Sequence, residues 1–184
     1  MTSLPTRLNL RRLKELHLGD NQLSNIEPCT FCAAPHLAPL ALERNQIVKG
    51  LAAAFPPLFS SLTKLQLEGN LLEQEELEEV LNRLPNLATL SLARTGLVSF
   101  PADLIDNNKQ LTHLNLRCGC YLIENAAQAY TNITSFFLSS NYLVHLDPAV
   151  FSILPSLKHL DLAHNFLMSL PQPFFQVSTC CHGC

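Results

Sequence analysis

The sequence lacks the features that mark an enzyme, a nucleic-acid-binding protein or a membrane-spanning chain. Only 15% of its 184 residues are charged, and the basic residues are scattered, so no basic stripe for nucleic acid is present. No apolar run reaches the roughly 18 residues of a transmembrane helix, and MTSLPTRLNLRRLKEL at the start has no signal-peptide core. The motifs G-x-S-x-G and H-E-x-x-H and the phosphate-binding loop are also absent. We therefore expect a non-enzymatic protein without a cofactor.

A repeated pattern fills the chain instead. LKELHLGDNQLSNI (13–26) and LKHLDLAHNFLMSL (157–170) share the template L-x-x-L-x-L-x-x-N-x-L-x-x-(L/I), and seven copies of its first part start at residues 13, 37, 62, 87, 111, 133 and 157. Counted from each start, the apolar residues at offsets 3 and 5 alternate with period 2, which predicts a short strand rather than a helix. The inward-pointing pairs are Leu16/Leu18, Leu40/Leu42, Leu65/Leu67, Leu90/Leu92, Leu114/Leu116, Phe136/Leu138 and Leu160/Leu162.

Two further offsets carry a structural requirement. Offset 8 is asparagine in five copies, where a side-chain amide can bond the bent backbone of a turn as both donor and acceptor. Thr95 replaces it once, and in the fifth copy Gly119 occupies the offset, so we predict a one-residue bulge with Cys120 in the asparagine role. Offset 18 predicts a buried aromatic spine, because it holds Phe31, Phe55, Val80, Ile105, Phe151 and Phe175, with Ala129 breaking the series. Residues 73–84 have helical spacing and predict a short helix with a solvated glutamate face.

The template resembles that of the leucine-rich repeat family over nearly the whole chain. The resemblance implies an α/β solenoid shaped as a curved horseshoe, with a parallel concave sheet of about seven short strands and a convex side of loops, turns and short helices. Its 24-residue form is similar to that of extracellular proteins such as Toll-like receptor ectodomains. We expect a repeat domain over 1–175 and a flexible cysteine-rich tail over 176–184. The terminal caps of that subclass do not match here, so we expect a piece of a longer protein.

The seven cysteines lie in three clusters and leave several readings open. Cys29 and Cys32 form a C-x-x-C, for which we weigh a local disulfide or buried thiols above a zinc or redox site. Cys118 and Cys120 lie four coils away, roughly 19 Å at about 4.8 Å per strand, which is too far to share one ion. His159, Asp161 and His164 could also form a metal or acid/base group. We favour surface residues there, because the adjacent strand supplies no further ligand.

Ligands of such folds usually meet the concave sheet, so the outward positions of the strands are the candidate partner-binding residues. These are His17, Arg44, Lys64, Gln66, Arg94, His113, Asn115, Arg117, Phe137, His159 and Asp161. Their mixed charge favours a protein or peptide ligand over a polyanion, and Phe137 is expected to be the one large exposed apolar residue and the best hot spot. Asn132-Ile133-Thr134 is a glycosylation sequon.

Two functions remain open from the sequence. The first is a recognition module of a receptor-like protein, extracellular or at the cell surface if the chain is a piece of a longer protein. The second is an intracellular scaffold or regulatory subunit, cytoplasmic if the chain is complete. The ligand and the oligomeric state cannot be read from the residues.

Overall fold

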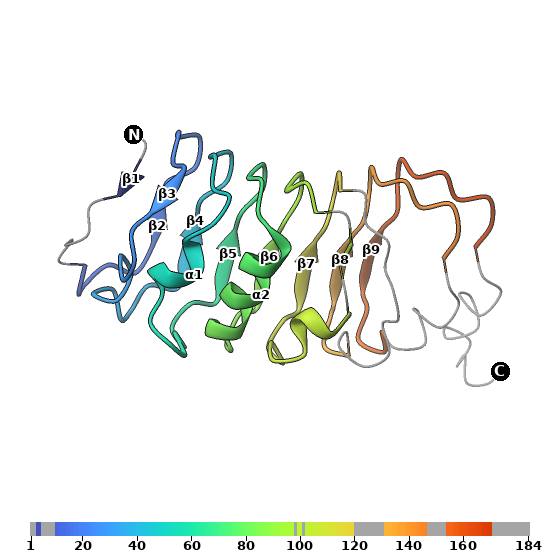
Figure 1. The fold of residues 1–184 in the computed structure, drawn as a ribbon. Helices are drawn as coiled ribbons and strands as arrows, with labels where there is room; N and C mark the ends of the chain where they lie inside the picture. Colours follow the sequence, from blue (N-terminus) through green and yellow to red (C-terminus); the bar gives the residue numbers. More distant parts are fainter. Residues whose placement is uncertain are drawn as a thin grey trace, which may run out of the picture.

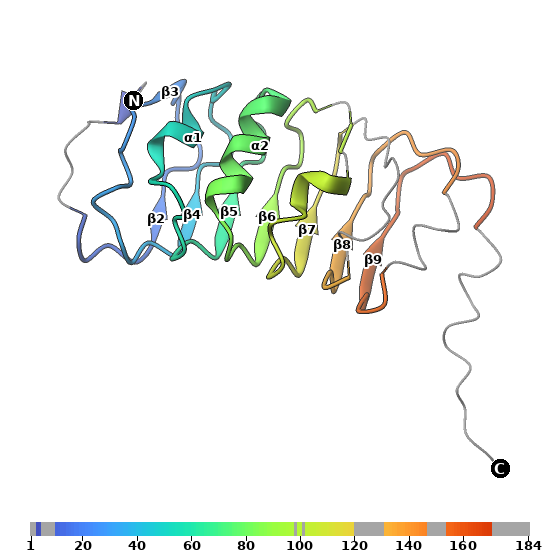
Figure 2. The ribbon, with the colours of Figure 1, turned by 60° about the horizontal axis from the view of Figure 1, so that its bottom comes forward.

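Seven short parallel strands form one sheet in the computed structural model, which describes residues 3–4, 10–97, 99–100, 102–119, 131–146 and 154–170. The strands follow one another in chain order: β2 (Leu16–His17), β4 (Pro39–Ala41), β5 (Lys64–Gln66), β6 (Thr89–Ser91), β7 (His113–Asn115), β8 (Ser135–Phe137) and β9 (His159–Asp161). They lie side by side along one long side of the molecule, and the helices lie on the other (Figures 1 and 2). The predicted solenoid with a seven-stranded parallel sheet is confirmed.

The register of the sheet follows the repeat template. Leu16, Leu40, Leu65, Leu90, Leu114, Phe136 and Leu160, all at offset 3, pair in that order across the sheet. In the five central copies the side chains at offsets 3 and 5 are at most 2% exposed, so they form the core. In the first and last copies these leucines are partly buried against the same core. At the N-terminal end, β1 (Ser3–Leu4) pairs with β3 (Asn25–Ile26) in a second, two-stranded sheet.

Four of the five asparagines at offset 8 join their coil to the coil before it. Asn70 is fully buried, and its amide donates to the carbonyl oxygens of Leu67 in its own coil at 3.0 Å and of Leu42 in the preceding coil at 2.9 Å. Its carbonyl oxygen accepts the backbone N–H of Ile47, also in the preceding coil, at 3.0 Å. Asn45, Asn141 and Asn165 repeat the donations to both coils. These asparagines therefore bond their own turn, as the sequence predicted, and also connect it to the neighbouring coil.

Offset 7 has a conformation that the sequence did not indicate. All seven residues there have positive φ, namely Asp20, Arg44, Gly69, Arg94, Cys118, Ser140 and His164. Cys118 shares this conformation, and β7 and β8 pair without a break, so the fifth copy keeps its register at least to that residue. Cys120 and the predicted bulge lie outside the described residues. Gly119 donates its backbone N–H to the Asn141 side chain at 2.8 Å.

The helices and the aromatic spine lie on the side opposite the sheet. They are α1 (Leu51–Ala54), α2 (Gln74–Arg83) and the 3-10 helix η1 (Ala102–Ile105). The helix predicted over 73–84 corresponds to α2, whose buried residues are Leu77, Val80 and Leu81. Of its glutamates, Glu76 is partly buried and accepts the backbone N–H of Ala52 at 2.6 Å, which ties α2 to α1.

The phenylalanine spine is present in the first coils. The rings of Phe31 and Phe55 stack at 5.1 Å between centroids, and Phe59 extends the stack at 5.7 Å from Phe55. Val80 and Ile105 continue the buried column without aromatic rings. The remaining predicted positions at this offset, Ala129, Phe151 and Phe175, lie outside the described residues, as does the tail over 176–184.

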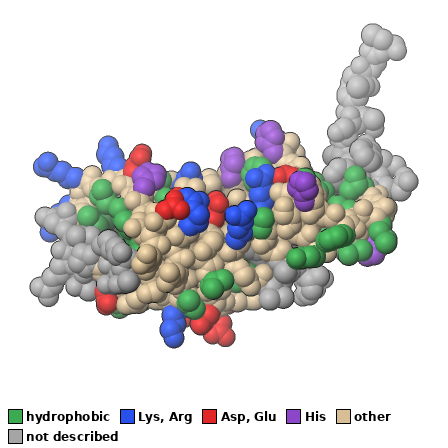
Figure 3. All heavy atoms as spheres, turned by 90° about the horizontal axis from the view of Figure 1, so that it is seen from above, with side chains coloured by type: hydrophobic (Ala, Val, Ile, Leu, Met, Phe, Trp, Pro, Cys, Tyr) green, Lys and Arg blue, Asp and Glu red, His purple; other side chains and the backbone are tan. Residues whose placement is uncertain are grey.

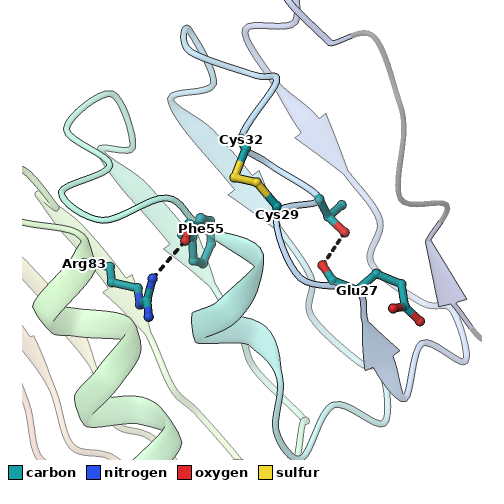
Figure 4. The surroundings of a disulfide bond; sticks show 6 residues. Glu27, Cys29, Cys32, Phe55 and Arg83 are labelled. Atoms are coloured by element: carbon teal, nitrogen blue, oxygen red, sulfur yellow. Dashed lines mark hydrogen bonds between the residues drawn. A yellow bond between two sulfur atoms is a disulfide. The ribbon is translucent and has the colours of Figure 1, made fainter.

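Cys29 and Cys32 form a disulfide that closes the short turn containing Phe31 (Figure 4). Both cysteines are exposed, while Phe31 between them is fully buried in the spine. The backbone N–H of Cys29 donates to the Ala53 carbonyl oxygen at 2.8 Å, so the next coil also holds this turn. The free Cys118 is partly buried four coils away.

Candidate binding surface

A shallow depression lies on the concave face over strands β5 to β8. It has a volume of about 280 Å³ and is lined by side chains from four adjacent coils. Six of the predicted partner-binding residues line it together: Lys64, Gln66, His113, Asn115, Arg117 and Phe137. Alternation along each strand explains the grouping, because the leucines between these positions point into the core. Glu68, Thr89 and Ser91 also line it, as do the strand residues Leu90 and Leu114. These residues were not among the candidate partner-binding residues.

A chain of hydrogen bonds fixes the floor of this depression. The Asn115 amide donates to the Ser91 hydroxyl oxygen at 2.9 Å, and the Ser91 hydroxyl donates to Glu68 Oε1 at 2.7 Å. The backbone N–H of Arg117 donates to Asn115 Oδ1 at 3.2 Å. Ser91 is only 5% exposed, so these groups are held in one arrangement before any ligand arrives.

Arg117 covers Phe137 at one side of the depression. The guanidinium carbon lies 4.9 Å from the ring centroid, within the range of a cation–π interaction, and the same group forms an ion pair with Asp161. Phe137 is consequently half-buried, so the expectation that it is the one large exposed apolar residue is wrong. The two side chains present a cation above an aromatic face, which is a common composition for an interface anchor.

Asp161 is a positioning group for Arg117. Burial raises the pKa of Asp161, but hydrogen bonds from the Ala163 backbone N–H and from the Arg117 and Ser139 side chains outweigh it, so the pKa lies below its usual value. The carboxylate is therefore ionised at neutral pH and holds the guanidinium over the ring. His159 and His164 do not share it, and the described residues contain no group of three His, Cys, Asp or Glu side chains arranged to hold a metal ion.

The other predicted residues lie on the same face but outside the depression. His17 is exposed on β2, with its Nε2 3.8 Å from a Glu15 carboxylate oxygen. Arg44 and Arg94 occupy the left-handed position after their strands, and Arg44 forms an ion pair with Asp20. Their mutual hydrogen bond raises the pKa of Arg44 and lowers that of Asp20.

An exposed apolar flank was missed at the sequence level. Tyr142, Val144, Phe166, Met168 and Leu170 are all exposed on the last two described coils, at offsets 9, 11 and 13. An alignment of the seven copies by offset reveals this flank, because aromatic residues stand at offset 9 in two successive copies.

Comparisons with known proteins agree with this architecture. Two family models described as leucine rich repeat match residues 12–34 and 131–177. The chain is 31% identical over 161 residues to rat leucine-rich repeat-containing G-protein coupled receptor 5, covering 85% of this chain and 17% of that protein. It is 29% identical over 163 residues to human podocan-like protein 1, covering 88% of this chain and 27% of that protein. The chain thus spans well under two thirds of these relatives.

The fold also recurs in solved structures. A crystal structure of a TLR13–ssRNA13 complex superposes with a TM-score of 0.80 at 25% identity, over 92% of this chain and 24% of that one. The stacked coils and open concave sheet define the class, a parallel-sheet repeat solenoid of the kind used for binding. The chain is a leucine-rich repeat protein, with repeats of the extracellular type. No helix among its described residues is both long and apolar enough to cross a membrane.

Proposed function

We propose that this chain is a non-enzymatic recognition module of an extracellular or cell-surface receptor-like protein, and that it binds a protein partner on its concave face. The observation that carries the proposal is the depression over β5 to β8, where six side chains chosen from the sequence alone converge. Its floor is fixed by the bonds among Glu68, Ser91 and Asn115. A fixed polar floor beside an aromatic anchor favours recognition, because little side-chain entropy is lost on binding.

The Cys29–Cys32 disulfide and the sequon at Asn132 support an extracellular location over the alternative of an intracellular scaffold. Disulfides persist in oxidising compartments and are rare in the cytosol. Asn132 is exposed on the turn before β8, and its amide donates one hydrogen bond, to the Lys109 carbonyl oxygen at 2.8 Å. A glycan attached there leaves the second N–H of this amide for the same bond. We propose that Asn132 carries a glycan when the chain passes through a secretory pathway.

The binding proposal is tested with an array of purified secreted and cell-surface ectodomains probed with the whole chain. For each ectodomain that binds, affinities are compared among the wild type, Phe137→Ala, Arg117→Met and His17→Ala. Loss of a central anchor removes about 2 kcal/mol, or roughly thirtyfold in Kd. His17→Ala is the matched control, because His17 is exposed on the same face outside the depression.

Unchanged affinity in both central variants would refute a binding site in the depression. An equal loss of affinity in His17→Ala would show that the partner contacts the whole concave face and not the depression in particular. Glycosylation is tested separately, by secretion from animal cells and treatment with a glycosidase that removes N-linked chains. A mobility shift that Asn132→Gln abolishes supports the proposal, while a wild-type chain that is secreted without any shift contradicts it.

A further inference from the structure

The apolar flank is a surface feature that concave binding does not use. Its five members, here called the flank patch, are exposed by 68% for Tyr142, 41% for Val144, 63% for Phe166, 81% for Met168 and 41% for Leu170. Figure 3 shows hydrophobic side chains gathered on one flank toward the C-terminal end of the solenoid. Single exposed apolar residues need no explanation, but a contiguous group of this size marks a contact surface.

The fold holds the flank patch in one arrangement. Tyr142 and Phe166 each directly follow an offset 8 asparagine that is buried or half-buried. Their rings stack with 5.9 Å between centroids and 14° between the planes. The backbone N–H of Phe166 donates to the Leu143 carbonyl oxygen at 3.0 Å, and that of Met168 to the Val144 carbonyl oxygen at 3.4 Å. The two rings therefore lie nearly parallel, and the backbone bonds hold the two coils against each other.

The area of the flank patch matches what a weak dimer needs. At these exposed fractions each side chain shows on the order of 100 Å², so the flank patch presents on the order of 500 Å². Two copies that face each other would bury on the order of 1,000 Å² in total, which is the lower bound for a specific interface.

Charge distinguishes the candidate occupants. Residues 141–146 and 165–170 contain no Lys, Arg, Asp or Glu, and His145 is their only titratable group apart from Tyr142. The flank patch therefore offers no charge that would select an oppositely charged partner, and it offers none that would repel its own copy. A two-fold axis brings the same surface to both sides, so a flat stack of two rings meets an identical stack.

We propose that the flank patch is a self-association surface, whose partner is a second copy of this chain related by a two-fold axis. The contact involves offsets 9, 11 and 13, which lie beyond the strands, so both concave faces stay open in the dimer. Two concave sites on one particle would raise the avidity for a multivalent ligand without any new contact to it.

The test is sedimentation equilibrium of the whole chain from roughly 1 to 200 µM, the range in which an interface of this size dissociates. Only protein that migrates as a monomer on a non-reducing gel is used, so that cysteine cross-links do not contribute. The double variant Tyr142→Ser/Phe166→Ser is expected to weaken dimerisation at least tenfold. Leu71→Ser is the matched control, because Leu71 is 66% exposed at the same offset 9 but three coils from Tyr142.

Dimerisation that the double variant loses and Leu71→Ser keeps supports the proposal. A wild-type chain that stays monomeric over the whole range overturns it, and so does a dimer that the double variant leaves unchanged. Sedimentation with phosphatidylcholine vesicles is a third arm, and capture of monomers that the double variant abolishes would assign the flank patch to a lipid surface instead. Unaltered thermal melting shows that each variant is folded.

Discussion

Replacing Asn70 with alanine removes three hydrogen bonds from the interior of the solenoid at once. The side chain is fully buried and joins the third coil to the second through the Leu42 carbonyl oxygen and the Ile47 backbone N–H. The Leu42 carbonyl keeps a second donor in this variant, the Asn45 amide at 2.9 Å. The loss therefore falls mainly on the Ile47 N–H, which has no other acceptor among the described contacts and is shielded from water.

The size of the effect follows from these bonds. A buried donor left without an acceptor costs about 1 to 3 kcal/mol, and each further hydrogen bond contributes about 1 kcal/mol, so Asn70→Ala is expected to lower the free energy of unfolding by about 3 kcal/mol. Asn70→Thr should cost less, about 2 kcal/mol. Its hydroxyl can copy Thr95, which donates to the Leu92 carbonyl oxygen in its own coil at 2.7 Å.

The measurement is urea unfolding at pH 7, followed by circular dichroism, with the slope compared among variants to verify that the same surface unfolds. Asn21→Ala is the control, because among the described residues the exposed Asn21 bonds only the Leu18 and Gly19 carbonyl oxygens of its own turn, so its loss should cost under about 1 kcal/mol. If Asn70→Ala is no more destabilising than Asn21→Ala, the asparagines do not hold neighbouring coils together and the reasoning is wrong.

Three further predictions use the same unfolding assay. Because the folded-state pKa of Asp161 is lowered, its ion pair with Arg117 stabilises the fold above the unfolded pKa near 3.9, and this contribution is lost as the pH falls through the folded value. Asp161→Asn should cost under about 1 kcal/mol at pH 7, and an equal deficit at pH 2 would contradict this. Reducing the Cys29–Cys32 disulfide should lower the free energy of unfolding by up to about 2 kcal/mol without unfolding the chain, because the closed loop is short. Complete unfolding by reductant would show that the disulfide is required for folding. Gly69→Ala should cost about 1 kcal/mol, since φ is +68° there, and a gain in stability would refute strain at this turn.

The repeat template predicted the backbone well because each coil has the same requirements. Each strand needs its apolar side chains at offsets 3 and 5, and in five of the seven copies an asparagine at offset 8 supplies an amide to the turn. The apolar pair recurs at every copy, so seven segments give the same strand and the same pairing. The helix over 73–84 was also predicted, because its apolar spacing and helix-forming residues agree with each other.

The left-handed turn at offset 7 could not be predicted from residue type. Its occupants include arginine, cysteine and serine, which are not among the residue types enriched at positive φ. Hydrogen bonds between coils account for it, since the backbone N–H of Arg94 donates to the Arg117 carbonyl oxygen at 3.0 Å and that of Ser140 to the Ala163 carbonyl oxygen at 2.8 Å. Contacts made only after stacking therefore stabilise a conformation that the isolated residue would disfavour.

The outward-facing residues of the candidate binding surface could be predicted from the sequence, but the contacts between neighbouring coils could not. Period 2 along each strand identified the outward residues, and six of them share one depression. The burial of Phe137 was missed because it depends on Arg117, which lies two offsets further along on the adjacent coil. Diagonal neighbours on adjacent strands are within reach of long side chains, so such pairs are found only by reading two copies together.

The two aromatic rings of the flank patch stand at a position that the template does not specify. This position is offset 9, and its first three occupants are Gln22, Gln46 and Leu71. A residue at this offset lies outside the core, so the template does not require an apolar side chain there. Tyr142 and Phe166 nevertheless stand at this offset in successive copies and bring their rings together. Since neither the core nor the concave face requires them, their pairing is best explained by a contact outside the chain.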